Sequence, residues 1–232
     1  MRIIEFNGLP GCGKTTISRA LYASISERGL RPVYYNDIRL KLPSGVWKKG
    51  TYILRHWNLK EVLCLRKIAK CFKKIPFKEK WTRILYTEQI ASNYRAFRSK
   101  EGICIADQGL LQGIVSIGYT HDFISNSTQQ DFIKHSSDFL SPYYRQMLII
   151  NVQVAPEESL IRLRSREKNY GRFDDVASDS ALLSGLEKQK LLFQLLWEGC
   201  LAGKSNVISI SSTNNPDGNV GIILGHISEK DC

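Results

Sequence analysis

The segment from Gly8 to Thr15 reads Gly-Leu-Pro-Gly-Cys-Gly-Lys-Thr and matches the pattern G-x-x-x-x-G-K-[ST] at every fixed position. In this pattern, glycines let backbone N–H groups surround a phosphate at the start of a helix. The lysine reaches the β and γ oxygens, and the final hydroxyl binds Mg²⁺. The sequence therefore predicts a site for a nucleoside triphosphate. We expect its contacts from Gly8, Gly11, Cys12, Gly13, Lys14, Thr15 and Thr16, with Lys14 also acting on the transferred phosphoryl group.

Both flanks of this motif have the pattern that its mechanism needs. Residues 2–6, Arg-Ile-Ile-Glu-Phe, are typical of a short apolar strand, and the stretch from Thr15 to Arg28 is typical of a helix that ends before Gly29. The alternative is a glycine-rich turn that binds nothing. A strand directly before the loop and a helix directly after it favour the nucleotide site.

Two acidic residues follow other apolar strands. The apolar run that ends at Asp107 has a Walker-B-type pattern, so we expect Asp107 to hold Mg²⁺ together with Thr15. Residues 31–36 predict another strand, which places Asp37 at its carboxyl end. There Asp37 could take a proton from an attacking hydroxyl as the catalytic base. Alternatively, it caps the turn before Ile38.

The spacing of the apolar runs predicts the fold class. A chain of 232 residues favours a single domain over residues 1–232. Alternation of strands and helices predicts an α/β fold, a three-layer, doubly wound, five-stranded parallel sheet. Ligands bind at the carboxyl edge of such sheets, where Gly8, Asp37 and Asp107 all fall. The expected strands cover residues 2–6, 31–36, 102–107, 147–154 and 206–210. Three further helices are expected: one that begins at Pro156, one from Ser178 or Asp179 to about Ala202, and one over 221–228.

The excess positive charge is confined to one part of the chain. Residues 41–83 hold thirteen Lys or Arg and two Glu, which accounts for the whole formal net charge of +11, and they include three of the four tryptophans. Apolar spacing predicts an amphipathic helix over 52–75 that ends at Pro76, and a second helix over 80–98. We therefore expect a basic helical insertion between the second and third strands.

This insertion suits three kinds of partner: a nucleic acid, an anionic lipid surface or a polyanionic small substrate. The alternative is a solvated helical hairpin whose tryptophans pack on the core. Apolar residues exposed on the 52–75 helix would also support a homodimer.

Several classes of protein are disfavoured. Six cysteines without a CxxC pair and only four histidines indicate neither a zinc site nor a disulfide framework, as is typical of reduced thiols. No apolar run reaches the length of a membrane span, and the first strand belongs to the phosphate-binding motif, so we expect a cytoplasmic protein. The GTPase motif N-K-x-D lacks its lysine at Asn214–Asp217. A transporter-ATPase signature would have to precede the Walker-B-type strand, whereas Leu183-Ser184-Gly185 follows it.

The remaining class is a small kinase. The segment from Arg162 to Asp174 is a predicted helix leading into an arginine-rich loop, and it resembles the lid of nucleoside and nucleotide kinases, especially the thymidylate kinase-like group. The resemblance covers residues 1–37, 102–115 and 147–228. It implies ATP and Mg²⁺ as cofactors, a lid over 162–175 whose Arg166 and Arg172 act on the phosphoryl group, and a loop over 211–216, with Thr213, beside the adenine.

The sequence departs from this group at one position. Gln108 of Asp107-Gln108-Gly109 stands where the group has an arginine that helps to hold substrate or phosphate. A neutral amide is a weaker partner for an anion than a guanidinium, which puts a monophosphate acceptor in doubt.

We interpret the chain as an ATP-dependent phosphotransferase, a small P-loop kinase that transfers the γ-phosphoryl group to a nucleoside, a nucleotide or another small molecule with a hydroxyl group. The alternative is a regulatory or binding ATPase whose basic segment docks on nucleic acid or anionic membrane.

Overall fold

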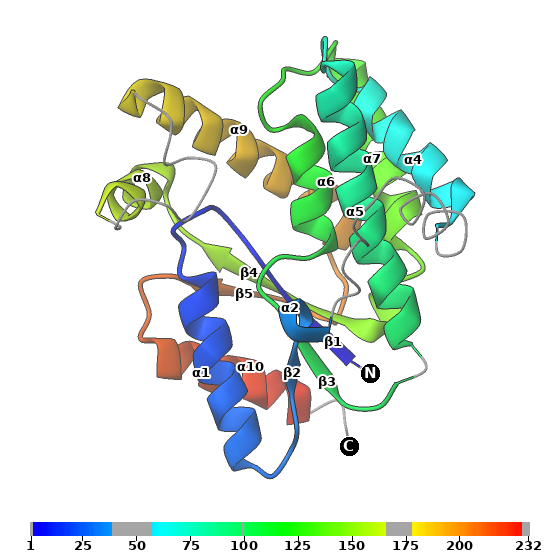
Figure 1. Cartoon of the computed structure of the whole chain (residues 1–232). Helices are drawn as coiled ribbons and strands as arrows, with labels where there is room; N and C mark the ends of the chain where they lie inside the picture. The colour runs from blue at the N-terminus through cyan, green and yellow to red at the C-terminus, as the bar shows by residue number, and fades with distance from the viewer. Residues whose placement is uncertain (1, 39–56, 99, 166–177, 229–232) are drawn as a thin grey trace.

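The computed structural model describes residues 2–38, 57–98, 100–165 and 178–228. Its centre is a five-stranded sheet in the order β2-β3-β1-β4-β5, and every neighbouring pair is parallel (Figure 1). The fold class predicted from the sequence is therefore confirmed. The strands are β1 (Arg2–Asn7), β2 (Val33–Tyr34), β3 (Ile103–Ala106), β4 (Met147–Gln153) and β5 (Val207–Ser211).

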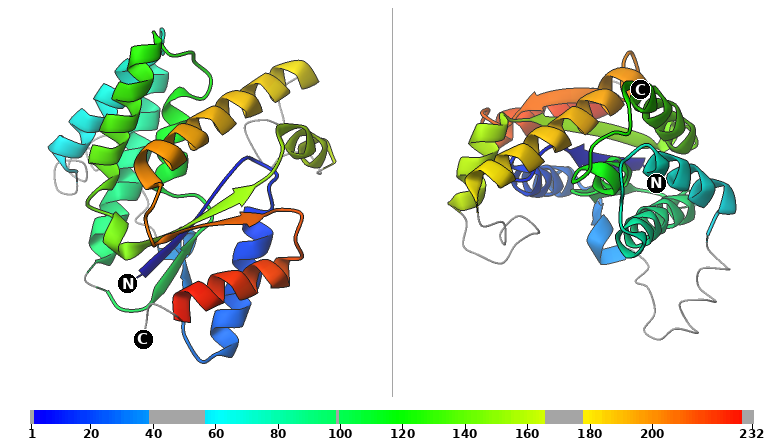
Figure 2. Two further views of the ribbon diagram at one scale, coloured as in Figure 1. Left: turned by 180° about the vertical axis from the view of Figure 1, so that it is seen from behind. Right: turned by 90° about the horizontal axis from the view of Figure 1, so that it is seen from above.

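Helices cover both faces of the sheet, as the alternation of strand side chains requires. On one face, Ile4 and Phe6 pack with α1 (Lys14–Glu27) and α10 (Pro216–Ser228). The remaining helices lie on the other face, where Ile3 belongs to a larger core (Figures 1 and 2). These helices are α4 (Leu59–Lys70), α5 (Phe77–Phe97), α6 (Leu110–Gly118), α7 (Asn126–Leu140), α8 (Pro156–Arg164) and α9 (Asp179–Leu196), with a 3₁₀ turn at Tyr144–Gln146 and a π turn at Trp197–Leu201. Of these helices, α8 stays outside that core and packs on α9 through Leu163, Leu182 and Leu186.

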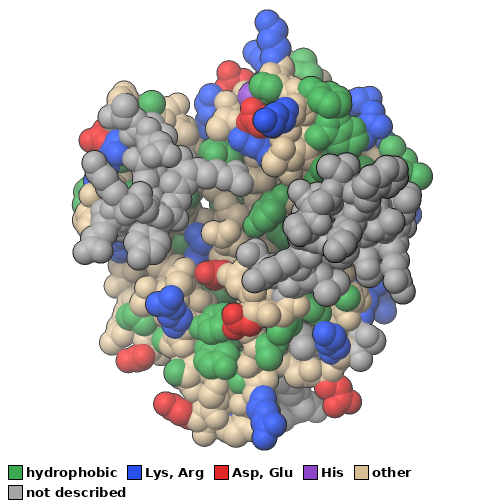
Figure 3. Space-filling view, viewed as in Figure 1, with side chains coloured by type: hydrophobic (Ala, Val, Ile, Leu, Met, Phe, Trp, Pro, Cys, Tyr) green, Lys and Arg blue, Asp and Glu red, His purple; other side chains and the backbone are tan. Residues whose placement is uncertain are grey.

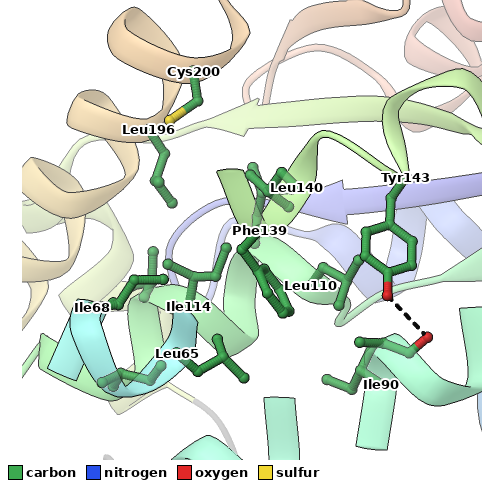
Figure 4. Close-up of a cluster of buried hydrophobic side chains, with 14 of the residues drawn as sticks. Leu65, Ile68, Ile90, Leu110, Ile114, Phe139, Leu140, Tyr143, Leu196 and Cys200 are labelled. Carbon is green, nitrogen blue, oxygen red and sulfur yellow. Dashed lines mark hydrogen bonds between the residues drawn. The ribbon is translucent and has the colours of Figure 1, made fainter. Parts of the chain in front are cut away.

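The larger core is built where α4, α5, α6 and α7 meet (Figure 4). Leu65 and Ile68 of α4 and Ile114 of α6 are fully buried there together with Phe139 and Leu140 of α7. These positions bear out the apolar spacing from which a helix was predicted in the basic segment. None of the described helices is both long and apolar enough to cross a membrane.

The ends of the helix in the basic segment differ from the prediction. Within the described residues, α4 starts after Asn58, whose side chain accepts a hydrogen bond from the Lys60 amide and caps the helix. The predicted end at Pro76 is wrong, because α4 stops at Lys70 and Phe72 forms an antiparallel bridge with Phe123. Pro76 instead precedes α5, which suits a residue with a fixed φ and no amide donor.

The second strand is shorter than predicted and ends at Tyr34. A short helix, α2 (Tyr35–Ile38), follows at once, so Asp37 lies in this helix and not at the end of a strand. Packing explains the early turn. The ring of Tyr35 is buried edge-on against Tyr94 and Phe97 of α5, at centroid distances of 5.8 and 6.2 Å.

Candidate active site

The loop between β1 and α1 requires glycine at three positions, the two fixed positions Gly8 and Gly13 of the pattern and the variable position Gly11. Gly8, Gly11 and Gly13 have φ angles of 138°, 84° and 89°, a region that other residues rarely adopt. At Gly8 a Cβ atom would also collide with the carbonyl oxygen of Val152 in β4. The motif therefore forms the turn that its pattern predicts, at the carboxyl end of the central strand (Figure 1).

Lys14 is the first residue of α1, and its side chain folds back over this loop. Its Nζ donates to the carbonyl oxygens of Gly8 at 2.9 Å and Leu9 at 2.8 Å, and it lies 3.5 Å from Cys12 Sγ. Cys12 itself is buried in the core beneath α1, whereas Thr16 is exposed on the first turn of that helix. The ammonium group thus lies over the loop whose amides would surround a phosphate.

Thr15 and Asp107 meet across the carboxyl edge of the sheet. Thr15 Oγ1 donates to Asp107 Oδ2 at 3.3 Å, and Asn36 Nδ2 of α2 lies 3.5 Å from Asp107 Oδ1. Hydroxyl and carboxylate oxygens are the ligands that Mg²⁺ prefers, with water and substrate phosphates completing its shell. Such a pair of protein oxygens would suit an ion whose remaining ligands come from water and nucleotide phosphates. The described residues hold no group of three or more His, Cys, Asp or Glu suited to a metal.

Asp37 is the residue next to Asn36. Its side chain is exposed, and α2 lies against β3, which leads to Asp107. The structure thus brings Asp37 to the same edge of the sheet as Lys14, Thr15 and Asp107.

A buried carboxylate that we did not single out from the sequence supports this edge. Glu5 of β1 is fully buried and accepts hydrogen bonds from the amides of Leu110 and Leu111 and from Tyr94 Oη, each at 2.9 Å. Burial raises the pKa of Glu5, and these hydrogen bonds oppose the rise. Glu5 therefore ties the start of α6, just after Asp107, to the strand that carries the phosphate-binding loop. The signal in the sequence is one acid inside an otherwise apolar strand.

Arg162, at the start of the predicted lid segment, contacts the phosphate-binding loop. Its Nη1 lies 3.5 Å from the Gly11 carbonyl oxygen, and its Nη2 lies 3.4 Å from that of Ser212 and pairs with Glu158. Ser159 Oγ donates to the Pro10 carbonyl, which docks α8 on the same loop.

The other arginines of the predicted lid differ in their positions. Arg164 points to the start of α9, where it binds Asp179 at 2.7 Å. Arg166 and Arg172 lie outside the described residues, so the lid over 162–175 stays a prediction.

A cavity of about 670 Å³ lies beside the loop. Its walls include Gly8, Leu9 and the ends of β4 and β5, and Phe193 and Trp197 line its α9 side. Ser212 Oγ is buried and has no hydrogen-bond partner among the described residues. Thr213, predicted to contact the nucleotide, is exposed and lines the cavity, with its hydroxyl 2.7 Å from Ser211 Oγ. Figure 3 shows the molecule hollowed between the α8–α9 side and the α5–α6 side.

No protein-family model and no curated protein sequence matches this chain. Solved structures do match it. Deoxyadenosine kinase from M. mycoides with bound dATP superposes with a TM-score of 0.50 at 13% identity, covering 98% of this chain and all of that one. The same enzyme with the products dCMP and a flexible dCDP gives a TM-score of 0.54 at 16% identity over 98% of this chain and 99% of that one. At such identities the likeness concerns the fold, and the chain therefore has the fold of the P-loop nucleoside kinases.

Proposed function

We propose that this chain is an ATP-dependent kinase that transfers the γ-phosphoryl group to a hydroxyl group of a nucleoside-type acceptor. Its fold is that of nucleoside kinases, and its central loop keeps every fixed position of the phosphate-binding motif. The observation that carries the proposal is the contact of Thr15 Oγ1 with Asp107 Oδ2 at 3.3 Å, directly beside Lys14. It joins the phosphate-binding loop to an acid of the neighbouring strand, as phosphoryl transfer requires.

Each of these residues then has a defined task. Thr15 and Asp107 would hold Mg²⁺, which supplies charge neutralisation at the phosphates when bound. Lys14 contacts the loop at Gly8 and Arg162 contacts it at Gly11, and both would stabilise the negative charge that develops on the phosphoryl oxygens. Glu5 holds the start of α6 behind Asp107 and thus orients that carboxylate.

Asp37 is our proposed general base. The acceptor hydroxyl oxygen bonds to the γ-phosphorus, the bond from that phosphorus to the bridging oxygen breaks, and ADP departs. The hydroxyl proton passes to the Asp37 carboxylate. The exposed position of Asp37 in α2, next to an asparagine that contacts Asp107, supports this role.

The acceptor is best matched by a hydroxyl without a neighbouring phosphate. Gln108, the residue after Asp107, is exposed at the site edge and carries no charge to offset a monophosphate. We therefore favour nucleosides over nucleotides as acceptors.

The test is product formation from ATP with a panel of nucleosides, nucleoside monophosphates and sugars, resolved by chromatography. We expect a phosphorylated nucleoside. Asp37→Asn should lower kcat by roughly 10²–10⁴-fold while ATP affinity is kept. Asp131→Asn, an exposed change on α7, is the matched control. Nucleotide binding without any phosphorylated product would favour a regulatory ATPase, and loss of ATP binding in Asp37→Asn would exclude Asp37 as the base.

A further inference from the structure

The outer face of α4 and the first turn of α5 expose large apolar side chains among cations. Leu59 is 72% exposed, Leu63 is 45% exposed and Phe77 is 75% exposed. A single exposed apolar side chain is ordinary, but several gathered on one surface are typical of a binding site. We call this surface the basic apolar strip and define it by its residues, Leu59, Leu63, Arg66, Lys67, Lys70, Phe77 and Trp81.

Helical spacing puts apolar and basic residues of the strip on one side of α4. The inner side of that helix, centred on Leu65 and Ile68, is buried in the core. Leu59 and Leu63 are one turn apart on the outer side, and the exposed Arg66, Lys67 and Lys70 follow Leu63 by three, four and seven residues. Leu63 is therefore next to Arg66 and Lys67, and Leu59 lies one turn before it on the same side.

Contacts between the two helices continue the strip onto α5. The Arg66 guanidinium lies 5.5 Å from the centre of the Trp81 ring, and the Phe77 ring is 6.1 Å from the same ring. Figure 3 shows hydrophobic and basic side chains next to one another on this part of the molecule. The strip therefore runs along α4 and over the start of α5.

The charged residues of the strip itself are all positive. Both acids of this region are engaged elsewhere, since Glu61 is buried against Arg95 and Glu79 pairs with Arg83. Further exposed cations nearby are Lys60, Lys73, Lys74 and Lys78. The exposed acids Asp131 and Asp138 of α7 act on Cys64 and Cys71, on the flank of α4 and not among the residues of the strip.

We infer that the basic apolar strip docks this protein on an anionic lipid surface. Lysines and arginines gain from the negative potential of such a surface, and leucine, phenylalanine and tryptophan enter the boundary between headgroups and acyl chains. A nucleic acid would use the cations but would leave Leu59 and Leu63 without a stacking partner, and Arg66 already covers the ring of Trp81. The exposed aliphatic residues therefore favour a lipid surface.

Sedimentation of the full chain with lipid vesicles tests this inference. We expect binding to vesicles that contain phosphatidylserine, weaker binding at high salt, and little binding to pure phosphatidylcholine. Changing Arg66, Lys67 and Lys70 together to Gln should weaken binding by roughly 100-fold, about fivefold for each cation. The double variant with Leu63→Ser and Phe77→Ser should weaken binding to these vesicles at low salt and at high salt alike.

The matched control changes the exposed residues Arg28, Arg31 and Arg145 to Gln, which removes the same amount of charge outside the strip. This control should bind the vesicles more strongly than the variant with the three changes in the strip. Three results would overturn the inference: equal losses in the two triple variants, binding to single-stranded oligonucleotides but not to vesicles, or a dimer that dissociates in the serine variant. ATP binding, measured in every variant, reports folding independently of both the lipid surface and the kinase reaction.

Discussion

Lys14 has no structural task that would prevent its removal. Its ammonium group contacts only atoms of the loop, the carbonyl oxygens of Gly8 and Leu9 and the Sγ of Cys12, among the described residues, so Lys14→Ala should fold normally. We expect kcat/KM to fall by the equivalent of about 3–5 kcal/mol, because a cation in a closed phosphoryl-transfer site stabilises the charge of the transition state. Product formation and far-ultraviolet circular dichroism measure the two effects, with the exposed α7 residue Lys134→Ala as control. A folded Lys14→Ala variant with full activity would contradict the proposed kinase function.

Glu5, unlike Lys14, is a structural residue, because it holds the start of α6 in position. The variant Glu5→Gln places an amide N–H₂ where the carboxylate accepts three donors, so at least one buried donor loses its partner. We expect the free energy of unfolding to fall by about 2–4 kcal/mol in urea titrations. Tyr94→Phe removes one of the donors and should cost less, about 1–2 kcal/mol. Equal stability of Glu5→Gln and the wild type would show that this carboxylate does not hold α6.

At the scale of elements, alanine substitutions of two glycines in or beside helices separate a steric clash from a change in helix propensity. Gly109 precedes α6 with φ of −138°, which any residue can adopt, but a Cβ there would collide with Glu5. Gly221 lies in α10, and a Cβ there would meet nothing within 4 Å. We expect Gly109→Ala to destabilise by about 1–3 kcal/mol or more, and Gly221→Ala to stabilise by about 0.5–1 kcal/mol. Thermal unfolding measures the stability of both variants. If both variants were stabilised, or both destabilised, the described packing around Gly109 and Gly221 would be contradicted.

A buried carboxylate at the contact between α4 and α5 makes the stability of the fold depend on pH. Glu88 is fully buried and accepts from Arg95 at 2.9 Å and from the Asn58 amide at 3.0 Å, and Arg95 also pairs with Glu61. Burial, aided by the charge of Glu61, raises the pKa of Glu88 from 4.5 to about 7, against the hydrogen bonds from Asn58 and Arg95.

The raised pKa fixes the sign of the effect. Between pH 4.5 and about 7, Glu88 holds a proton in the folded chain that it has released in the unfolded chain. The contribution of Glu88 to the free energy of unfolding is therefore complete below pH 4.5 and is lost as the pH rises through 7. We expect the free energy of unfolding contributed by Glu88 to fall from pH 5 to pH 8, and Glu88→Gln to flatten that part of the profile. Urea titrations across this range measure it, and an unchanged slope in Glu88→Gln would exclude Glu88 as the source.

At the scale of the whole molecule, strand order decides what surrounds the phosphate-binding loop. Because β1 lies between β3 and β4, the loop that follows it meets Asp107 on one side and α8 on the other. The basic segment packs on the helical face farther from α1, so its exposed strip lies away from the α1–α10 face (Figure 2). A lipid surface bound there would leave the α1–α10 face free.

The sequence by itself determined the features that depend on local geometry. The fixed glycine, lysine and threonine positions, with a strand before the loop and a helix after it, predicted the phosphate-binding loop. Apolar runs alternating with helical segments predicted the parallel sheet and most helices. The predicted end of the basic helix at Pro76 was wrong, because the pairing of Phe72 with Phe123 is not a local property.

Only the tertiary structure decided which distant side chains meet. Glu5 bonds the start of α6, more than a hundred residues away, and Arg162 reaches the loop at Gly11. The early end of β2 likewise follows from packing of Tyr35 on α5, which moved Asp37 into a helix. Such contacts depend on how strands are ordered and how helices pack, and neither residue type nor spacing along one segment encodes them.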